Sequence, residues 1–414
     1  MQITKQNWLP TIINFAVTLF FPSIFIVKGG YNIAPALLTL LGLGYGVYAL
    51  IKKTHFNLKI TDKWLIYSYL FYFFVFVFSL VFNGGKIREL DYPSRVLLFI
   101  PVLLLLLKYP IKTCVLSYSI PLGSIISLCV ALYDKFILNL RPEQNPRIMH
   151  IQGGDISMSL GVFSLIIALY AHQKKDVKLT TLSVIGGLCG IVGSLLSTAR
   201  GGWVALPVLL IVILYIYRHS LSKRFFLTFF GIIVVASIGI SQMPNNRIME
   251  RINVAQKDIQ LYLDNHDGNT SLGARFEMWK SALEMAKEKP LFGWGIQGAT
   301  EKRKQETEEK IATGNIGQFT HAHNQYLDDL SKRGIIGLLA LLAVLFIPLR
   351  AFMKKLNTTN DEVKLIATLG VAHILSVMIY GLSQGFLVHN SGTIFYFFLT
   401  IVFYAAIRTH QKAE

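Results

Sequence analysis

Long apolar stretches separated by short polar connections recur along almost the whole chain. A helix needs about 20 mostly apolar residues to cross a bilayer, and twelve stretches are candidates for such helices. They are centred on residues 10–28, 31–51, 64–83, 94–108, 112–133, 156–172, 178–198, 203–217, 224–241, 335–352, 363–384 and 390–408. The pattern predicts an all-α polytopic membrane protein with about twelve transmembrane helices, nine of them within residues 1–241 and three within residues 335–414.

Composition supports a chain that lies mostly in lipid. Hydrophobic residues make up 53% and charged residues 15% of the 414 positions, whereas a soluble domain carries about 25% charged residues. The net charge of +17 does not point to nucleic acid, because the long connection, residues 242–334, holds thirteen basic and thirteen acidic residues. The excess lies in the short connections between helices, and the partner that we expect is the lipid bilayer, with no nucleic acid.

The basic residues outside the long connection divide unevenly between the two sides of the membrane. The two termini and every second connection carry nineteen Lys and Arg in total, whereas the short connections of the other side carry eight. Cytoplasmic connections of membrane proteins hold the excess of positive charge. The pattern therefore predicts that both termini are cytoplasmic and that residues 242–334 lie on the opposite side of the membrane.

The long connection has the spacing of a small helical cap. Apolar residues recur at helical intervals over residues 248–263 and 276–286. The charged run 301–312 predicts a solvated helix, and a last helix is expected from about Asn324 to Arg333, before Gly334. These elements predict a helical domain that lies on the membrane surface.

Two arginines are candidates for binding an anion. Arg200 stands between two apolar runs and is followed by two glycines, which allow a ligand to approach the backbone closely. Arg275 falls in the first turn of a predicted helix, whose N-terminus favours anions. Each has an alternative explanation: Arg200 could extend to lipid headgroups, and Arg275 could form an ion pair with Glu277 or Glu288.

The segment His321-Ala322-His323-Asn324 is a candidate for acid–base chemistry. Histidine has an unperturbed pKa of about 6.5, which suits general acid–base catalysis near neutral pH. His321 and His323 could instead ligate zinc, although zinc would require a third ligand, or they could be ordinary surface residues.

Other residues of the same side are weaker candidates. Glu89 and Asp91 could hold a divalent cation that neutralises a diphosphate, although neighbouring basic residues such as Arg95 favour ordinary ion pairs. The segment Arg141–Asp155 is another candidate, in which Arg147 could add a phosphate contact, although it could also be a simple structured loop. His389 lies at the mouth of the last predicted helix.

Three stretches resemble the O-antigen ligase family, within a larger group that includes O-antigen polymerases and protein O-glycosylating enzymes. His323-Asn324, nine further residues and Gly334-Ile335-Ile336-Gly337 fit the family pattern of His, Asn/Ser/Gln, nine residues, Gly, two residues, Gly/Thr/Tyr. Residues 197–203 resemble the Ser-x-x-Arg-Gly segment of the family, and residues 275–295 resemble the segment that opens its large periplasmic loop. Twelve spans with a large loop between the ninth and the tenth match the architecture of the family.

The resemblance implies a membrane-embedded (GT-C type) glycosyltransferase of the Gram-negative inner membrane, with its site facing the periplasm. It implies O-antigen ligase activity, in which O-antigen is transferred from undecaprenyl diphosphate to the lipid A–core oligosaccharide in lipopolysaccharide biosynthesis, with inversion and without a metal or other cofactor. By the same resemblance, His323 matches the catalytic histidine, and Arg200 and Arg275 match the diphosphate-binding arginines. Further candidates for this site are His321, Asn324, Arg147 and His389.

Three alternatives stay open. An O-antigen polymerase and a protein O-oligosaccharyltransferase belong to the same group; the His–Asn–x9–Gly pattern speaks against the first, and the short end after the last span speaks against the second. A secondary transporter would also have about twelve spans. Transporters usually contain two related halves, however, and here only one half carries the insertion of residues 242–334.

Overall fold

The computed structural model describes residues 8–142, 147–219, 221–222 and 247–410. Within them, eleven helices are long and apolar enough to cross a membrane, which confirms the predicted all-α polytopic fold. They are α1 (Leu9–Ile26), α2 (Ile33–Ile51), α3 (Ile60–Phe82), α4 (Asp91–Lys108), α5 (Thr113–Phe136), α6 (His150–Gln173), α7 (Val177–Ser197), α8 (Arg200–Tyr217), α13 (Gln325–Met353), α14 (Asp361–Tyr380) and α15 (Asn390–His410). Each overlaps one of the predicted spans, and the remaining prediction, residues 224–241, lies outside the described residues.

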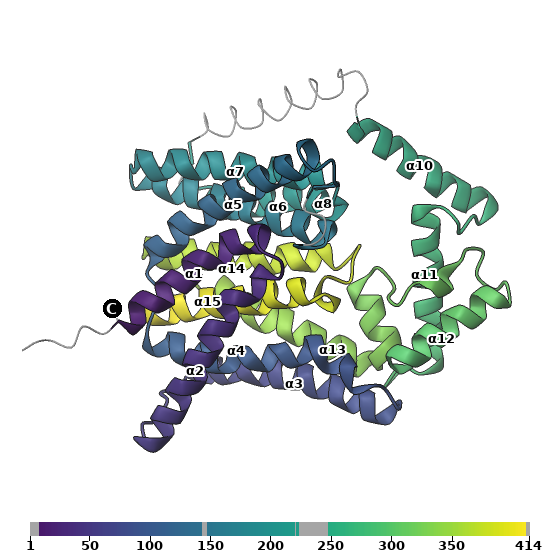
Figure 1. Ribbon diagram of the computed structural model, residues 1–414, viewed down its shortest axis with the longest axis horizontal. Helices are drawn as coiled ribbons and strands as arrows, with labels where there is room; N and C mark the ends of the chain where they lie inside the picture. Colours follow the sequence, from purple (N-terminus) through teal and green to yellow (C-terminus); the bar gives the residue numbers. More distant parts are fainter. Residues whose placement is uncertain (1–7, 143–146, 220, 223–246, 411–414) are drawn as a thin grey trace, which may run out of the picture.

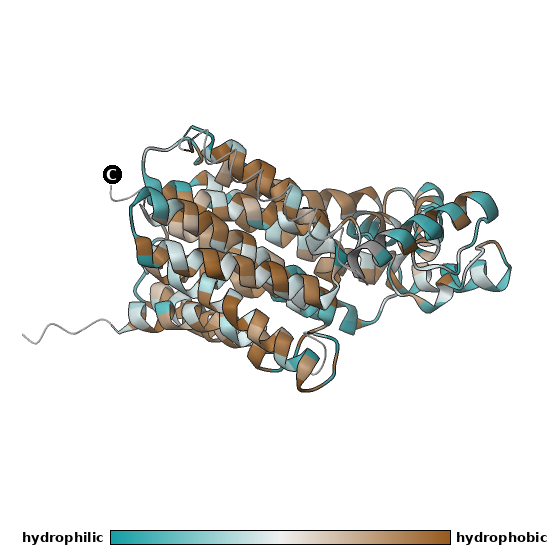
Figure 2. Ribbon diagram, turned by 90° about the horizontal axis from the view of Figure 1, so that it is seen from above, coloured by the Kyte–Doolittle hydropathy of each residue, from teal (hydrophilic) through white to brown (hydrophobic). Residues whose placement is uncertain are grey.

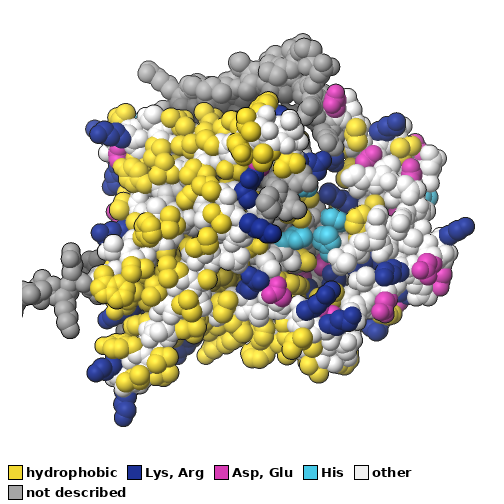
Figure 3. Space-filling model, viewed as in Figure 1, with side chains coloured by type: hydrophobic (Ala, Val, Ile, Leu, Met, Phe, Trp, Pro, Cys, Tyr) yellow, Lys and Arg dark blue, Asp and Glu magenta, His cyan; other side chains and the backbone are white. Residues whose placement is uncertain are grey.

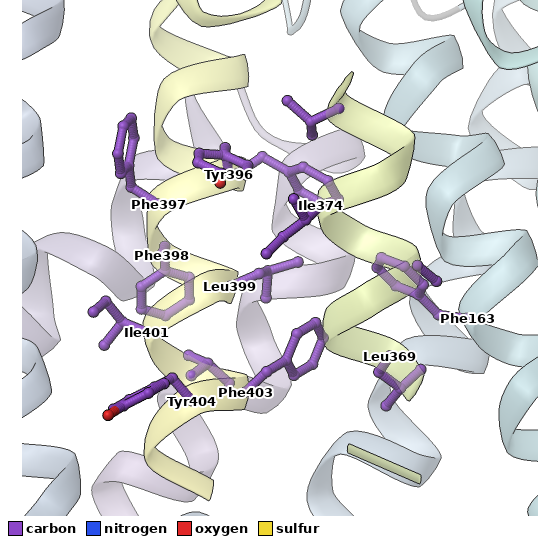
Figure 4. Packing of buried hydrophobic residues seen from close by; sticks show 14 of the residues in the cluster. Phe163, Leu369, Ile374, Tyr396, Phe397, Phe398, Leu399, Ile401, Phe403 and Tyr404 are labelled. Atoms are coloured by element: carbon purple, nitrogen blue, oxygen red, sulfur yellow. The ribbon is translucent and has the colours of Figure 1, made fainter. Parts of the chain in front are cut away.

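The centre of the bundle is formed by α6, α14 and α15 (Figure 1). These three helices are buried over most of their surface, whereas outer helices such as α2 and α3 turn many apolar side chains outward. A helix that is apolar on all sides belongs in a packed interior or in lipid. The packing of the centre is shown in Figure 4, where Phe403 of α15 lies near Phe163 of α6, with ring centroids 5.9 Å apart.

A helical cap lies at one end of the bundle, opposite the end where α1 begins and α15 stops (Figure 1). It contains α10 (Arg247–Asn265), α11 (Ser271–Glu288), α12 (Gly295–Glu308) and the short η3 (Ile316–Gln318). Figure 2 shows the change from the apolar bundle to the mostly hydrophilic cap. The helices predicted over residues 248–263 and 276–286 are therefore present.

The charged run 301–312 is not the fully solvated helix that its sequence predicts. It falls partly in α12, where Arg303 is fully buried and Glu306 is nearly so. The Arg303 guanidinium donates from Nε to the backbone carbonyl of Phe319 at 3.2 Å. One side of this charged helix therefore packs inside the cap, which a count of charged residues could not reveal.

The join between the cap and α13 depends on two glycines with left-handed backbone. Gly293 has φ 68° and Gly334 has φ 63°, a conformation that side chains with a Cβ adopt at a cost. A Cβ on Gly334 would lie 2.3 Å from the backbone of Leu291. Gly334 therefore bends α13 between its cap segment and its membrane segment, as the predicted end of the last cap helix requires.

Hydrogen bonds tie the start of α13 to the turn that follows α14. The Asn324 side chain caps α13 by accepting from the second and third backbone N–H groups of the helix, and its Nδ2 donates to the carbonyl of Leu382 at 3.2 Å. The backbone N–H of Gln325 donates to the carbonyl of Gly381 at 2.7 Å, and its Oε1 accepts from the N–H of Leu387. The segment that carries the predicted histidines is thus fixed relative to the spans.

Candidate active site

A cavity of about 210 Å³ lies at the junction between the cap and the bundle. Arg200 at the start of α8 and Arg275 of α11 both line it, so two residues that the sequence singles out separately meet in one place. Basic and histidine side chains gather at the boundary between the apolar bundle and the cap (Figure 3). The full lining is Arg141, His150, Ile151, Asp155, Thr198, Ala199, Arg200, Gly201, Ser271, Arg275, Ser383 and Gln384.

Three helices begin at this cavity. Its lining includes His150, Arg200 and Ser271, which are the first residues of α6, α8 and α11. A helix N-terminus presents unpaired backbone N–H groups and about half a positive charge. At α11, the N–H groups of Leu272 and Gly273 already donate to Asp258 and Thr270. The two arginine side chains, with the N–H groups that remain, make the cavity suited to an anion that carries more than one negative charge.

Arg275 is a cation without an ion-pair partner among the described residues. The predicted alternative, a pair with Glu277 or Glu288, is wrong. Glu277 accepts from the hydroxyl of Tyr262 at 2.7 Å, and Glu288 pairs with Lys302 at 3.1 Å. Burial lowers the pKa of Arg275, and the nearby positive charge of Arg200 lowers it further.

Close packing of small residues fixes the position of Arg200 at the start of α8. Thr198 adopts left-handed backbone (φ 62°) between α7 and α8, and a Cβ on Gly201 would come within 3.0 Å of an Asp155 carboxylate oxygen. Asp155 is fully buried, lines the cavity and approaches the backbone N–H of Gly202. The Asp155 side chain thus packs against the N-terminus of α8, and the glycines that follow Arg200 have a packing role here.

Three histidines and one glutamine form a cluster beside the cavity. The rings of His321 and His323 lie 4.2 Å apart between centroids, and the ring of His389 lies 5.9 Å from that of His321. Gln384, which also lines the cavity, has its Oε1 3.0 Å from Nδ1 of His323 and its Nε2 3.2 Å from Nε2 of His389. The structure thus places His321 and His389, both weaker predictions, next to His323.

The surroundings of this cluster favour neutral imidazoles. Burial lowers the pKa of His323, and the charge of Arg275 contributes to the lowering, against hydrogen bonding by Gln384, which raises it. Burial lowers the pKa of His321 to about 3, with a further contribution from His323. The pKa of His389 is also lowered, by burial and then by His323. A neutral imidazole can accept a proton, so His323 has the form that a general base needs.

Side chains from three helices hold the backbone that carries His321 and His323. This histidine loop, residues 319–323, accepts hydrogen bonds at three carbonyl groups and donates one at an N–H group. The bonds are Arg303 Nε to the carbonyl of Phe319 (3.2 Å), Lys332 Nζ to that of Thr320 (2.8 Å), Trp279 Nε1 to that of Ala322 (3.1 Å), and the Ala322 N–H to Asp328 Oδ1 (2.9 Å). They hold His323 in left-handed backbone at φ 47°, a strained conformation for a side chain of this size.

Other predicted residues are engaged elsewhere. Arg147 forms an ion pair with Asp134 and is not part of the cavity lining. Asp91 pairs with Arg95 at 3.2 Å, and Glu89 accepts a hydrogen bond from α12 of the cap. In the part of the chain that the structure describes, no three His, Cys, Asp or Glu side chains are grouped as metal ligands would be.

The sequence prediction does not select Gln384, whereas Arg141, His150 and Asp155 all fall within the predicted candidate segment Arg141–Asp155. Arg141 and His150 contact each other, with Nη1 3.0 Å from Nε2, in the same connection from which the sequence selects Arg147. Asp155 directly precedes the predicted span 156–172, where it follows Gly153 and Gly154. Gln384 is the last residue of the predicted span 363–384, and no pattern in the sequence marks it as a site residue.

Comparison with known proteins shows where this chain belongs. A model of the family described as O-antigen ligase matches residues 184–342, a range that includes Arg200, Arg275 and His323. An uncharacterized protein of Haemophilus influenzae is 43% identical over 399 residues, which cover 96% of this chain and 99% of the relative. The chain is therefore a multi-pass membrane protein of the O-antigen ligase family, whose members act in glycan transfer of the O-antigen and lipopolysaccharide type.

Proposed function

We propose that this protein is an O-antigen ligase that transfers O-antigen polysaccharide from undecaprenyl diphosphate to the lipid A–core oligosaccharide. The observation that carries the proposal is the cavity at the cap–bundle junction, where three helix N-termini and the guanidiniums of Arg200 and Arg275 surround one volume beside a neutral histidine. A lipid diphosphate is an anion whose headgroup sits at the membrane boundary. The position of the cavity therefore matches that of the donor.

The arginines supply the electrostatic part of the reaction. Cleavage of the bond between the anomeric carbon and the diphosphate oxygen builds negative charge on a leaving group that is already anionic. Arg200 and Arg275 are held by packed helices before any ligand binds, and Arg275 has no carboxylate partner to compete for it among the described residues. Fixed donors of this kind stabilise charge as it develops in the transition state.

His323 supplies the proton acceptor. A hydroxyl of the lipid A–core is a weak nucleophile until its proton is removed, and a neutral imidazole can remove it. The new bond forms between this hydroxyl oxygen and the anomeric carbon, while the electron pair of the broken bond leaves with the diphosphate. Attack opposite the leaving group inverts the anomeric centre, and no step requires a metal ion.

The same proposal sets the protein in the Gram-negative inner membrane, with both termini cytoplasmic and the cap in the periplasm. Two observations support this orientation. Lys and Arg are in excess in the connections at the end of the bundle opposite the cap. The start of α1 and the end of α15 also lie at that end (Figure 1). A periplasmic cap would meet donor and acceptor on the side where O-antigen is completed.

A polymerase or a protein O-oligosaccharyltransferase would share the donor chemistry and differ in the acceptor. The test is therefore a choice of acceptor. Purified protein in lipid vesicles is supplied with undecaprenyl-diphosphate-linked O-antigen and with lipid A–core, a second O-antigen donor or an acceptor protein, one at a time. We expect a longer product only with lipid A–core, seen as a shift on a gel.

Three variants and one control test the residue assignments in the same assay. Arg200→Ala, Arg275→Ala and His323→Ala should each abolish transfer, while His266→Ala, an exposed histidine of the same cap, should leave it unchanged. A cell lacking the gene should accumulate lipid-linked O-antigen beside bare lipid A–core. Transfer at the wild-type rate by correctly inserted His323→Ala protein would remove the central assignment.

A further inference from the structure

Gln384 joins the two parts of the site. It lies in the turn after α14, is 3% exposed, and lines the same cavity as Arg200 and Arg275. Its amide oxygen lies 3.0 Å from Nδ1 of His323, and its amide nitrogen lies 3.2 Å from Nε2 of His389. One buried amide therefore contacts a histidine of the cap and a histidine at the start of α15.

Among the described residues, this contact is the only hydrogen bond made by the His323 ring. The ring of His321 lies against it at 4.2 Å, but both nitrogens of His321 lack a hydrogen-bond partner in the described part of the chain. The other polar groups that face His323 act through charge: Arg275 of α11 and Asp328 of α13. Hence only Gln384 can determine which ring nitrogen of His323 carries the proton.

An amide has one accepting end and one donating end, and a neutral imidazole has one nitrogen of each kind. When Oε1 of Gln384 faces Nδ1 of His323, that nitrogen must carry the hydrogen, and Nε2 keeps its lone pair. The Nε2 group of Gln384 then donates to His389, whose Nε2 must accept. The same amide thus fixes the tautomers of both rings.

We propose that Gln384 is the positioning residue of the general base, because it holds the Nδ1–H of His323 and so leaves Nε2 free to accept the proton of the acceptor hydroxyl. The inference rests on the proposed function. In the step, the hydroxyl proton moves to Nε2, the hydroxyl oxygen bonds to the anomeric carbon, and the diphosphate leaves with the electron pair. The imidazolium donates from Nδ1 to Gln384 throughout and later releases the Nε2 proton to water.

The position of Gln384 gives it a second effect on the same base. The turn that holds it is joined to the start of α13 by the bonds of Asn324 and Gln325 to the carbonyls of Leu382 and Gly381. These bonds fix the start of α13, which follows His323, relative to the turn after α14. That turn lines the same cavity as Arg200. These backbone bonds remain when the Gln384 amide is removed, so its loss should change the His323 imidazole, and hence turnover, more than donor binding.

Two substitutions separate positioning from structure. Gln384→Met keeps the volume and removes both hydrogen bonds, and we expect kcat for ligation to fall about 10- to 100-fold with little change in the KM for the lipid-linked donor. Gln384→Glu restores an acceptor for Nδ1–H but adds a negative charge. Because that charge favours the imidazolium, the acidic limb of the pH–rate profile should move to higher pH, and the KM for the donor should rise.

Gln260→Met is the matched control, since Gln260 is an exposed glutamine of α10 in the cap and does not line the cavity. It should leave the rate and the pH profile unchanged. A Gln384→Met protein with the wild-type kcat and pH profile would overturn the inference. The inference would also be overturned if the wild type is active and the acidic limb of the pH–rate profile is at the same pH in Gln384→Glu as in the wild type.

Failure of the proposed function would look different. In that case the wild-type protein would not ligate, or His323→Ala would remain active, whatever Gln384 does. A readout that needs no activity is the ¹⁵N NMR spectrum of protein labelled in histidine, with the His323 signal assigned by its loss in His323→Ala. We expect the Nδ1–H tautomer in the wild type and a mixture of tautomers in Gln384→Met; the Nε2–H tautomer in the wild type would overturn the inference.

Discussion

Replacing Arg275 by methionine should make the empty protein more stable and the enzyme much slower. Its guanidinium is partly buried, lies near the charge of Arg200, and has no ion-pair partner among the described residues. Burial and the like charge both disfavour its charged form, which is why its pKa is lowered. Methionine has a similar length and no charge, so both unfavourable effects disappear while the packing is mostly kept.

The size of the cavity gives the magnitude of the repulsion between the charges of Arg200 and Arg275. A volume of about 210 Å³ is about 7 Å across, and two like charges at that separation repel by about 2 kcal/mol at an effective dielectric constant of about 20. Partial exposure weakens the repulsion, so we expect a gain of about 1 kcal/mol, or roughly 1–2 °C in Tm for a chain of this size. Loss of one fixed donor to the leaving group should reduce kcat about 10²- to 10³-fold.

The assay compares two buried arginines in the same purified protein. Arg333 is 2% exposed, donates from Nε to Asp329 at 2.9 Å, and lies over the ring of Phe76 at 3.9 Å. Arg333→Met leaves a buried carboxylate unpaired and should lower the stability by about 3–5 kcal/mol. Thermal unfolding in detergent should therefore shift in opposite directions for Arg275→Met and Arg333→Met.

Inorganic pyrophosphate completes the test. It should raise the Tm of the wild-type protein, because a ligand that binds only the folded state stabilises it, and it should raise that of Arg275→Met much less. If Arg275→Met unfolds below the wild type, as Arg333→Met should, then Arg275 is an ordinary structural residue and the cavity is not a preformed anion site.

Three further predictions concern the histidine loop and the helix join. Ligation should stay near its maximum to below pH 6.5 and fall only in more acidic buffer, because a base with a lowered pKa, such as His323, remains neutral to lower pH; a pH–rate profile measures this. Asp328→Ala should cost about 3–5 kcal/mol and abolish ligation, since it leaves Lys332 unpaired in the interior and frees the histidine loop; thermal unfolding and the gel assay report the two effects. Gly334→Ala should reduce the yield of folded protein in detergent, whereas Gly44→Ala, where a Cβ meets nothing within 4 Å, should not.

The sequence predicts those features that depend on local patterns. The spans follow from apolar length, and the helices of the cap follow from spacing. The end of the last cap helix at Gly334 follows because glycine alone adopts its backbone easily. Arg200 and His323 stand out for a similar reason: each departs from what its local segment needs for folding, as functional residues often do.

What the sequence could not predict are relations between distant segments. Gln384 is 61 positions from His323, and nothing in its neighbourhood distinguishes it from other polar residues near the end of a span. Arg303 is the opposite case, since its highly charged surroundings predict exposure although it is fully buried. In both cases the role of the side chain is decided by the element that packs against it, and packing partners are not encoded in local periodicity.

Buried charges that are paired and buried charges that are not have different roles in this protein, and together they preorganise the site before the substrate binds. In the cap, Asp328 and Lys332 are paired at 2.7 Å and bond to the histidine loop, so that a strained His323 is held in place. At the cavity, Arg200 and Arg275 have no ion-pair partner among the described residues, and Asp155 is the acidic side chain in the lining. A rigid base beside two arginines without ion-pair partners favours a polyanionic ligand over water, and it favours the transition state, in which the ligand is most negative, over the bound donor. Burial is the main cause of the lowered pKa of His323, and the charge of Arg275 adds to it. The donor diphosphate would offset that charge on binding, so the imidazole should become more basic when a donor is present.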